Sequence, residues 1–251
     1  MNLKLISCDV FFREMCALAA RTPNRVDVQF LPKGLHDLKS DQMRERMQEA
    51  VDAVPADTYD AILLGYGLCN NGLHGLKARH TPMILPRAHD CITLFMGSRK
   101  RYLDYFENHH GVYFKTSGWI ERGTAEGDLK QLSIGHLHGM DMTYDEMVEK
   151  YGEDNAQYLF ETLVEAQSKS YGQYTFIEMG VEPDDRFERM TREQAAERNW
   201  QYEKIQGDLS LMERLVNGQW DDADFLRVPP AHRVVARYDE GIVTTAPDQQ
   251  T

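Results

Sequence analysis

The first half of the chain alternates short apolar segments with longer amphipathic ones. Segments of strand length, rich in Val, Ile, Leu and aromatic residues, occupy 3–7, 26–31, 59–65, 83–86 and 112–116. The segments between them carry apolar residues at helical spacing, most clearly over 41–53. Strands that alternate with helices at this pitch are typical of βαβ units. We therefore expect an α/β protein with a mainly parallel, Rossmann-like sheet flanked by helices.

The second half is predicted to be more helical. Further helices are expected through Phe11, Met15 and Leu18, and over the ranges 73–79, 93–107, 143–170 and 191–217, with strands at 174–179 and 232–237. This pattern divides the chain into a Rossmann-like half that carries the site at 1–121, a glycine-rich connection at 122–142, a helical and α/β half at 143–240, and a flexible tail at 241–251.

Composition narrows the class of partner. The formal net charge is -12, so the excess of Lys and Arg that a nucleic acid or an anionic membrane requires is missing. Apolar runs stay well below the ~20 residues of a membrane span. Four cysteines without a secretion signal do not indicate a disulfide framework. We expect a cytoplasmic protein that acts on a small molecule.

Three of the cysteines follow predicted strands. Cys8 comes directly after the first strand, Cys69 follows a glycine turn after the third, and Cys91 follows the strand at 83–86. The carboxyl ends of parallel strands meet at one edge of a sheet, so these thiols are expected to converge there. Thiolates suit zinc or a [4Fe–4S] cluster, and three protein ligands leave one position open for a substrate. The sequence therefore predicts a metal site, with zinc and iron–sulfur both open.

Two other interpretations of the cysteines compete with the metal site. Free cysteines often do no more than pack in a core, which suits Cys16 on the apolar side of the first helix. A thiolate nucleophile paired with His89 is the third possibility.

The residues around Cys69 and Cys91 carry groups that could hold a substrate. Gly65, Tyr66, Gly67 and Asn70 form a glycine-rich turn whose amides could bind an anion.

In the following loop, Arg87 could hold a carboxylate, and His89 could move a proton or act as a fourth ligand, with Asp90 orienting it. Asp90 is equally suited to cap a helix. His36 is a reserve ligand at the same sheet edge.

Other candidates lie farther along the chain. Trp119 is predicted to be a wall of the substrate site, and His136 and His138 could close over it. His109 and His110 are expected at a helix end facing water. Trp200 is predicted to be a core or wall residue, and Glu178 could serve as a general base.

Several segments resemble one uncharacterised family. They are Cys8, LPKGLH at 31–36, LLGYGLCNNGL at 63–73, LPRAHDC at 85–91 with Gly97 and Ser98, SGW at 117–119, and GDLSLMERLVNGQW at 207–220. Together they are similar to the family catalogued as a domain of unknown function, number 1638. Members of that family look like companions of corrinoid-dependent methyl-transfer systems. The resemblance thus implies one-carbon, methyl or sulfur chemistry, and a corrinoid protein or a methyltransferase as partner.

The leading hypothesis is a metal-dependent enzyme with Cys8, Cys69 and Cys91 as ligands. Zinc would suit methyl transfer to or from sulfur, whereas an open-site cluster would suit a lyase or desulfidase. The alternative is an accessory or binding protein for a corrinoid or methyltransferase system, in which the metal site is structural.

Overall fold

A five-stranded sheet forms the centre of the computed structural model, which describes residues 1–123, 127–133 and 144–248. Its strands, in the order β2–β1–β3–β5–β9, are β2 (Arg25–Leu31), β1 (Asn2–Cys8), β3 (Ala61–Gly65), β5 (Met83–Pro86) and β9 (Phe225–Val228). The first four run parallel, and β9 joins β5 antiparallel. The α/β prediction is confirmed, with a mixed, mostly parallel sheet.

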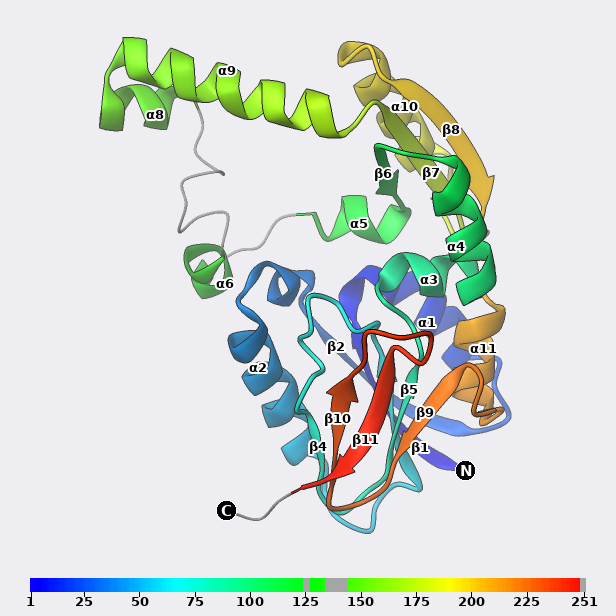
Figure 1. Ribbon diagram of the computed structural model, residues 1–251. Coiled ribbons are helices and arrows are strands. Elements are labelled where there is room, and N and C mark those ends of the chain that lie inside the picture. The colour runs from blue at the N-terminus through cyan, green and yellow to red at the C-terminus, as the bar shows by residue number, and fades with distance from the viewer. Residues whose placement is uncertain (124–126, 134–143, 249–251) are drawn as a thin grey trace.

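Helices cover both faces of this sheet (Figure 1). On one side α1 (Phe12–Ala19) packs against α11 (Ser210–Asn217), and on the other lies α2 (Ser40–Asp52). Every residue of β3 is buried, as expected for a parallel strand covered on both faces. The buried residues of α2 recur at helical spacing; they are Met43, Met47, Ala50 and Val51.

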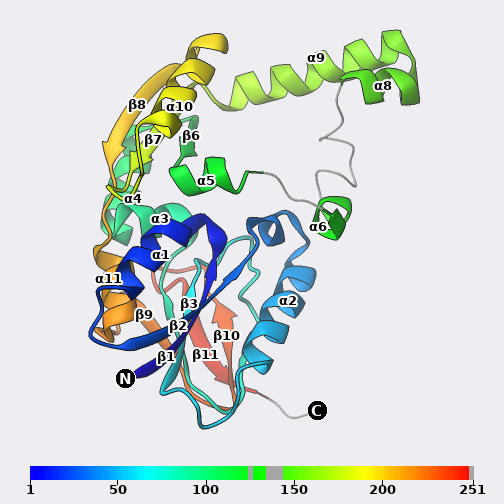
Figure 2. The same cartoon turned by 180° about the vertical axis from the view of Figure 1, so that it is seen from behind.

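A second, smaller sheet lies beyond the carboxyl ends of the first (Figures 1 and 2). It is parallel and consists of β6 (Val112–Lys115), β7 (Gln173–Glu178) and β8 (Gln201–Gln206). The helix α4 (Arg99–Asn108) contributes Tyr105, whose hydroxyl bonds to Thr175 and Glu203 on one face of it. The helix α10 (Arg186–Glu197) also contacts this sheet, through β7 and β8.

The remaining elements connect or flank these two sheets. A third sheet, β11–β10–β4, is antiparallel and contacts β9. Its strands and the other short elements are β4 (Lys77–Ala78), β10 (His232–Ala236), β11 (Val243–Pro247), η1 (Asp9–Phe11), η2 (Lys33–Asp37), α3 (Cys91–Met96), α5 (Ser117–Glu121), α6 (Gly127–Leu132), α8 (Tyr144–Tyr151) and α9 (Glu153–Ser170). Among the helices described, none combines the length and the apolar character that crossing a membrane requires.

Several sequence expectations about helices are wrong. The range 73–79 contains β4 and turns instead of a helix. The helix predicted over 93–107 is divided into α3 and α4, because Gly97 adopts a left-handed φ of 75° and the Ser98 hydroxyl caps the next helix by accepting from the Arg101 N–H. The region 143–170 is likewise divided, with Gly152 at a φ of 80° between α8 and α9.

The C-terminal third departs further from expectation. The helix predicted over 191–217 is interrupted by β8, after a reversal at Asn199, whose φ is 55°. The polar sequence of β8 carries no apolar strand signal, and its pairing with β7 decides its conformation. The strand at 112–116 belongs to the second sheet and not to the first. In the tail predicted at 241–251, residues 243–247 form β11.

Glu14, on the buried side of α1, is an unusual core residue. Its side chain is fully buried, and neither carboxyl oxygen has a hydrogen-bond partner among the described residues. Burial raises its pKa from 4.5 to about 8, and the charge of Glu182 contributes in the same direction. The carboxyl is therefore neutral in the folded protein at neutral pH.

This burial makes stability depend on pH. Between about 4.5 and about 8 the folded chain holds a proton on Glu14 that the unfolded chain releases, so stability falls as pH rises through this window. We expect Glu14→Gln to flatten the fall in unfolding free energy between about pH 6.5 and pH 8, as measured by urea denaturation. The measurement starts at about pH 6.5 because the buried His36, whose pKa is lowered from 6.5 to about 4, has the opposite effect below that pH.

Glu49→Gln is the matched control, since the Glu49 side chain is 69% exposed. A Glu14→Gln profile parallel to that of the unmodified protein would contradict a neutral Glu14.

Candidate functional site

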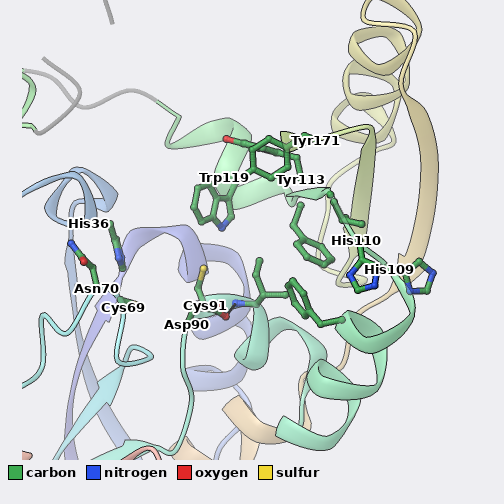
Figure 3. A pocket seen from close by; sticks show the side chains of 15 residues that line it. His36, Cys69, Asn70, Asp90, Cys91, His109, His110, Tyr113, Trp119 and Tyr171 are labelled. Atoms are coloured by element: carbon green, nitrogen blue, oxygen red, sulfur yellow. Dashed lines mark hydrogen bonds between the residues drawn. The ribbon is translucent and has the colours of Figure 1, made fainter. Parts of the chain in front are cut away.

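A pocket of about 640 Å³ opens between the carboxyl ends of the main sheet and the second sheet. Its floor includes Cys69, Asn70, Asp90 and Cys91 (Figure 3). Its walls are mostly aromatic and histidine side chains: His36, Phe106, His109, His110, Tyr113, Phe114, Trp119 and Tyr171. Apolar walls around a few polar groups are typical of a small-molecule site.

Three adjacent strands deliver the three cysteines to this region. Cys8 ends β1, Cys69 follows β3, and Cys91 begins α3 after β5. Because β1 pairs with β3 and β3 with β5, these strand ends are neighbours. All three side chains are buried. We refer to Cys8, Cys69 and Cys91 as the three thiols.

The turn that carries Cys69 has an uncommon backbone. Cys69, Asn70 and Asn71 have φ values of 39°, 51° and 59°, a left-handed run without glycine. Asn tolerates this region, but for Cys69 it is strained, and strained backbone concentrates at functional sites. The turn is fastened to the Cys91 loop by the Leu68 and Cys69 N–H groups, which donate to Ala88 and His89 carbonyls at 2.8 and 2.9 Å.

Gly67 makes this fastening possible. A Cβ at this position would lie 2.7 Å from the backbone of Asp90. The sequence predicted that this glycine lets the backbone approach a ligand. In the structure it lets the Cys69 turn and the loop before Cys91 approach each other.

The three thiols affect one another's ionisation. Burial is the main cause that raises the pKa of each thiol. A neighbouring thiolate raises it further: the Cys91 thiolate raises the pKa of Cys8, the Cys8 thiolate raises that of Cys69, and the Cys69 thiolate raises that of Cys91. Without a bound cation the thiols are therefore protonated at neutral pH. In the described part of the chain, however, no three or more His, Cys, Asp or Glu side chains are grouped as ligands of one metal ion.

His36 is the histidine that lies against a thiol. Its Nε2 is 3.3 Å from the Cys8 Sγ, and its ring stacks with Tyr66 at a centroid distance of 5.9 Å. Burial, with the charge of Lys33, lowers the His36 pKa to about 4, so the ring is neutral at physiological pH. A neutral imidazole can accept the Cys8 proton or act as a ligand.

Two buried donors lie near the thiols. The Tyr66 hydroxyl makes no hydrogen bond with the described residues, whereas the Trp119 Nε1–H acts on the Cys91 thiol as a hydrogen-bond donor. Burial raises the pKa of Tyr66, and the charges of Cys8 and Cys69 raise it further, so these two thiols act electrostatically on its hydroxyl. The Trp119 indole opposes the rise in the pKa of Cys91, and Figure 3 shows its ring above the Cys91 sulfur.

A close contact between α5 and η1 sets the position of Trp119. Gly118 lies against the Val10 carbonyl, and a Cβ there would overlap this oxygen. At the start of α5 the Thr116 hydroxyl accepts from the Trp119 N–H. The SGW segment thus brings an indole over a strand end from which it is remote in sequence.

The structure does not bring every predicted residue to the pocket. The Arg87 guanidinium donates to the carbonyls of Asp222, Gly241 and Val243, so it holds the C-terminal segments in place. His89 lines a second cavity of about 690 Å³, with Arg99 and Arg237.

The remaining predicted residues have other surroundings. Asp90 caps α3 by accepting from the Ile92 and Thr93 N–H groups, and it also accepts from the Tyr102 hydroxyl. Gly65 is packed against Ser7 in the sheet. His136 and His138 lie outside the described residues.

The sequence interpretation missed part of the pocket wall. His109 and His110 were expected to face water; His110 is indeed exposed, but both line the pocket, and His109 is partly buried and stacks on Tyr105 at 4.0 Å. Tyr113 and Phe114 also line it. The signal was the pair of histidines directly before an aromatic strand.

Two further expectations concern residues away from the pocket. Cys16 was expected to pack in the core but is exposed, because α1 buries Glu14, Met15 and Leu18 instead. Glu178 forms an ion pair with Lys204 at 3.3 Å.

Comparison with known proteins identifies a family. Curated proteins show no significant match to the chain, and solved structures show none either. Residues 30–216 match the family model described as "Protein of unknown function (DUF1638)", a segment that contains Cys69 and Cys91 and begins after Cys8. Because this match covers well over half of the sequence, the chain belongs to the DUF1638 family.

Proposed function

We propose that this protein is a metal-dependent enzyme that acts on a small molecule bound in the pocket. The three thiols would be its metal ligands, and the metal would be zinc or the open-site iron of a [4Fe–4S] cluster. The observation that carries the proposal is the buried Tyr66 hydroxyl, which has no acceptor among the described residues, together with the Trp119 indole that lies over the Cys91 sulfur.

The unpaired Tyr66 hydroxyl favours a bound anion or thiolates at this position. A buried donor without an acceptor costs about 1–3 kcal/mol. Metal binding deprotonates thiols, and thiolates or cluster sulfides accept hydrogen bonds. Tyr66 would then be satisfied, in the way that groups around metal ligands orient and tune them.

The topology supports a ligand site at this edge. We propose that the parallel strands form a Rossmann-like unit, since their order is β2–β1–β3–β5. The connections from β1 and from β2 place α1 and α2 on opposite faces of the sheet. The strand order therefore reverses between β1 and β3: β2 is added on one side of β1, and β3 and β5 on the other. Ligands of open α/β sheets bind outside the strand ends at such a point.

Metal binding requires the thiols to turn toward one another, because the described conformation has no ready-made ligand group. The positive charge of a metal would offset the burial that keeps these thiols protonated. His36, at 3.3 Å from the Cys8 Sγ, is placed to accept the proton that Cys8 releases or to complete the ligand set.

The pocket favours an enzyme over a closed structural site. Cys69 and Cys91 themselves line the pocket, so a fourth coordination position on the metal would face a substrate bound there. With zinc, that position would hold a substrate thiol for methyl transfer; with a cluster, it would hold the substrate of a lyase or desulfidase. A corrinoid protein or methyltransferase partner stays a prediction from the family resemblance.

The first test is metal content. We expect protein purified without oxygen to contain about one zinc per chain, or about four irons and four sulfides with a brown colour. Cys69→Ser should lose the metal, because it removes a central ligand, whereas Cys16→Ser should retain it, because Cys16 is exposed on α1. Elemental analysis, sulfide assay and visible absorption measure these outcomes.

Equal metal content in the two variants would refute the ligand assignment. Unmodified protein with neither metal in stoichiometric amount would refute the metal-dependent enzyme itself.

A second test concerns the indole above Cys91. If the Trp119 N–H donates to a metal-bound thiolate, Trp119→Phe should weaken metal affinity roughly tenfold while the stoichiometry is unchanged. Competition with a chromophoric chelator measures this affinity. Trp220→Phe is the control, since its Nε1 donates to the Leu215 carbonyl at 2.7 Å. Equal affinities in the two variants would mean that Trp119 is only a wall of the pocket.

A further inference from the structure

Two of the three thiols, Cys69 and Cys91, lie on segments that run side by side. Within the sheet, the strands that precede them, β3 and β5, pair in parallel. Beyond the strand ends the Leu68 and Cys69 N–H groups still donate to the carbonyls of Ala88 and His89, at 2.8 and 2.9 Å. The pairing of the two strands therefore continues into the turns, and Cys91 follows the partner of Cys69 by two residues.

Backbone contacts also bring the Cys69 sulfur to Cys91. Burial raises the pKa of Cys69, whereas the Cys91 and Gly67 N–H groups lower it as hydrogen-bond donors to its sulfur. Gly67 is itself packed against the Asp90 backbone, where a Cβ would lie 2.7 Å away. The Cys69 sulfur thus contacts the backbone of the residue that carries the second thiol.

Both of these thiols can be reached from the pocket. Cys69 and Cys91 line it, each residue is 7% exposed, and both are free thiols in the structure. Cys8 differs, because it is 1% exposed and its sulfur lies 3.3 Å from the His36 Nε2. A small reagent that enters the cavity of about 640 Å³ therefore meets Cys69 and Cys91.

The spacing of the two turns suits a disulfide. A bridge needs Cα atoms about 4.4–6.8 Å apart, and paired strands lie about 4.8 Å apart. The turns that continue the β3–β5 pairing hold Cys69 and Cys91 at a separation of this order. Cys69 also has a strained φ of 39°, and strained disulfides are the labile ones that serve catalysis or redox sensing.

We propose that Cys69 and Cys91 are a redox-active pair that a small organic disulfide, R–S–S–R, oxidises within the pocket. One protein thiol attacks the reagent, forms a mixed disulfide and releases R–SH. The second protein thiol attacks this mixed disulfide, closes the Cys69–Cys91 bridge and releases another R–SH. The protein gives up two electrons and two protons, and the two R–SH molecules carry them. A dithiol reductant reverses the exchange.

The bridge and the proposed metal exclude each other. Cys69 and Cys91 would be two of its three ligands, and a sulfur held in a disulfide is no longer a thiolate. Only this exclusion rests on the proposed function, because the bridge itself requires no metal. Oxidation would then release the metal, and bound metal would protect the pair from oxidation.

Peptide mapping of the protein, freed of any metal, tests the pair. Hydroxyethyl disulfide is the probe, because it is small and uncharged. Trypsin cuts after Lys77, Arg79 and Arg87, so Cys69 and Cys91 fall in different peptides. We expect mass spectrometry without reductant to find these two peptides joined, lighter than their sum by two hydrogen atoms. Dithiothreitol should separate them again.

Three serine variants are the matched controls. Cys8→Ser should keep the bridge, and so should Cys16→Ser, since Cys16 is exposed on α1. Cys91→Ser should abolish it and leave Cys69 joined to the reagent. A bridge from Cys8 in the unmodified protein would overturn the inference. So would Cys69 and Cys91 that stay reduced, or that each carry the reagent without joining.

The outcome is separable from that of the metal proposal. If both hold, the oxidised protein should bind no zinc or iron, and reduction with dithiothreitol should restore the binding. A bridge in a chain that binds no metal in either state would refute the metal-dependent enzyme and leave the redox-active pair standing. Stoichiometric metal in the reduced protein, without a bridge in the metal-free protein, would do the reverse.

Discussion

The site depends on the parallel pairing of β1 with β3 and of β3 with β5. This register places the turns after three neighbouring strands at one edge, and with them Cys8, Cys69 and Cys91. Parallel strands also require long connections, which carry α1 and α2 to opposite faces and leave the edge between them open. Backbone hydrogen bonds from the Cys69 turn to the Ala88 and His89 carbonyls then hold two of the three turns together.

Burial determines the chemistry available at that edge. It keeps the thiols protonated and His36 neutral, so the floor of the pocket carries little charge until something binds there. Away from the floor, Lys33 and Lys115 lie against the Trp119 and Tyr113 rings.

Close backbone contacts explain why the two sheets form one pocket. Gly118 on α5 rests against the Val10 carbonyl of η1, which fixes Trp119 over the end of β1 and the Cys91 turn. The second sheet supplies Tyr113 and Phe114 from β6, although the sequence suggested that this strand belonged to the first sheet. A strand of four residues carries no information about which neighbour it will pair with, and the later strand β7 decided it.

The sequence by itself determined the α/β class, the strands that bear the thiols, and the family, because apolar periodicity and glycine turns are local signals. Only the tertiary structure decided that Arg87 clasps the C-terminal segments, that Cys16 faces solvent, and that His109 and His110 line the pocket. It alone also placed Lys33 against the ring of Trp119, which lies far along the sequence from it. Such juxtapositions arise from packing between remote segments, which no local pattern encodes.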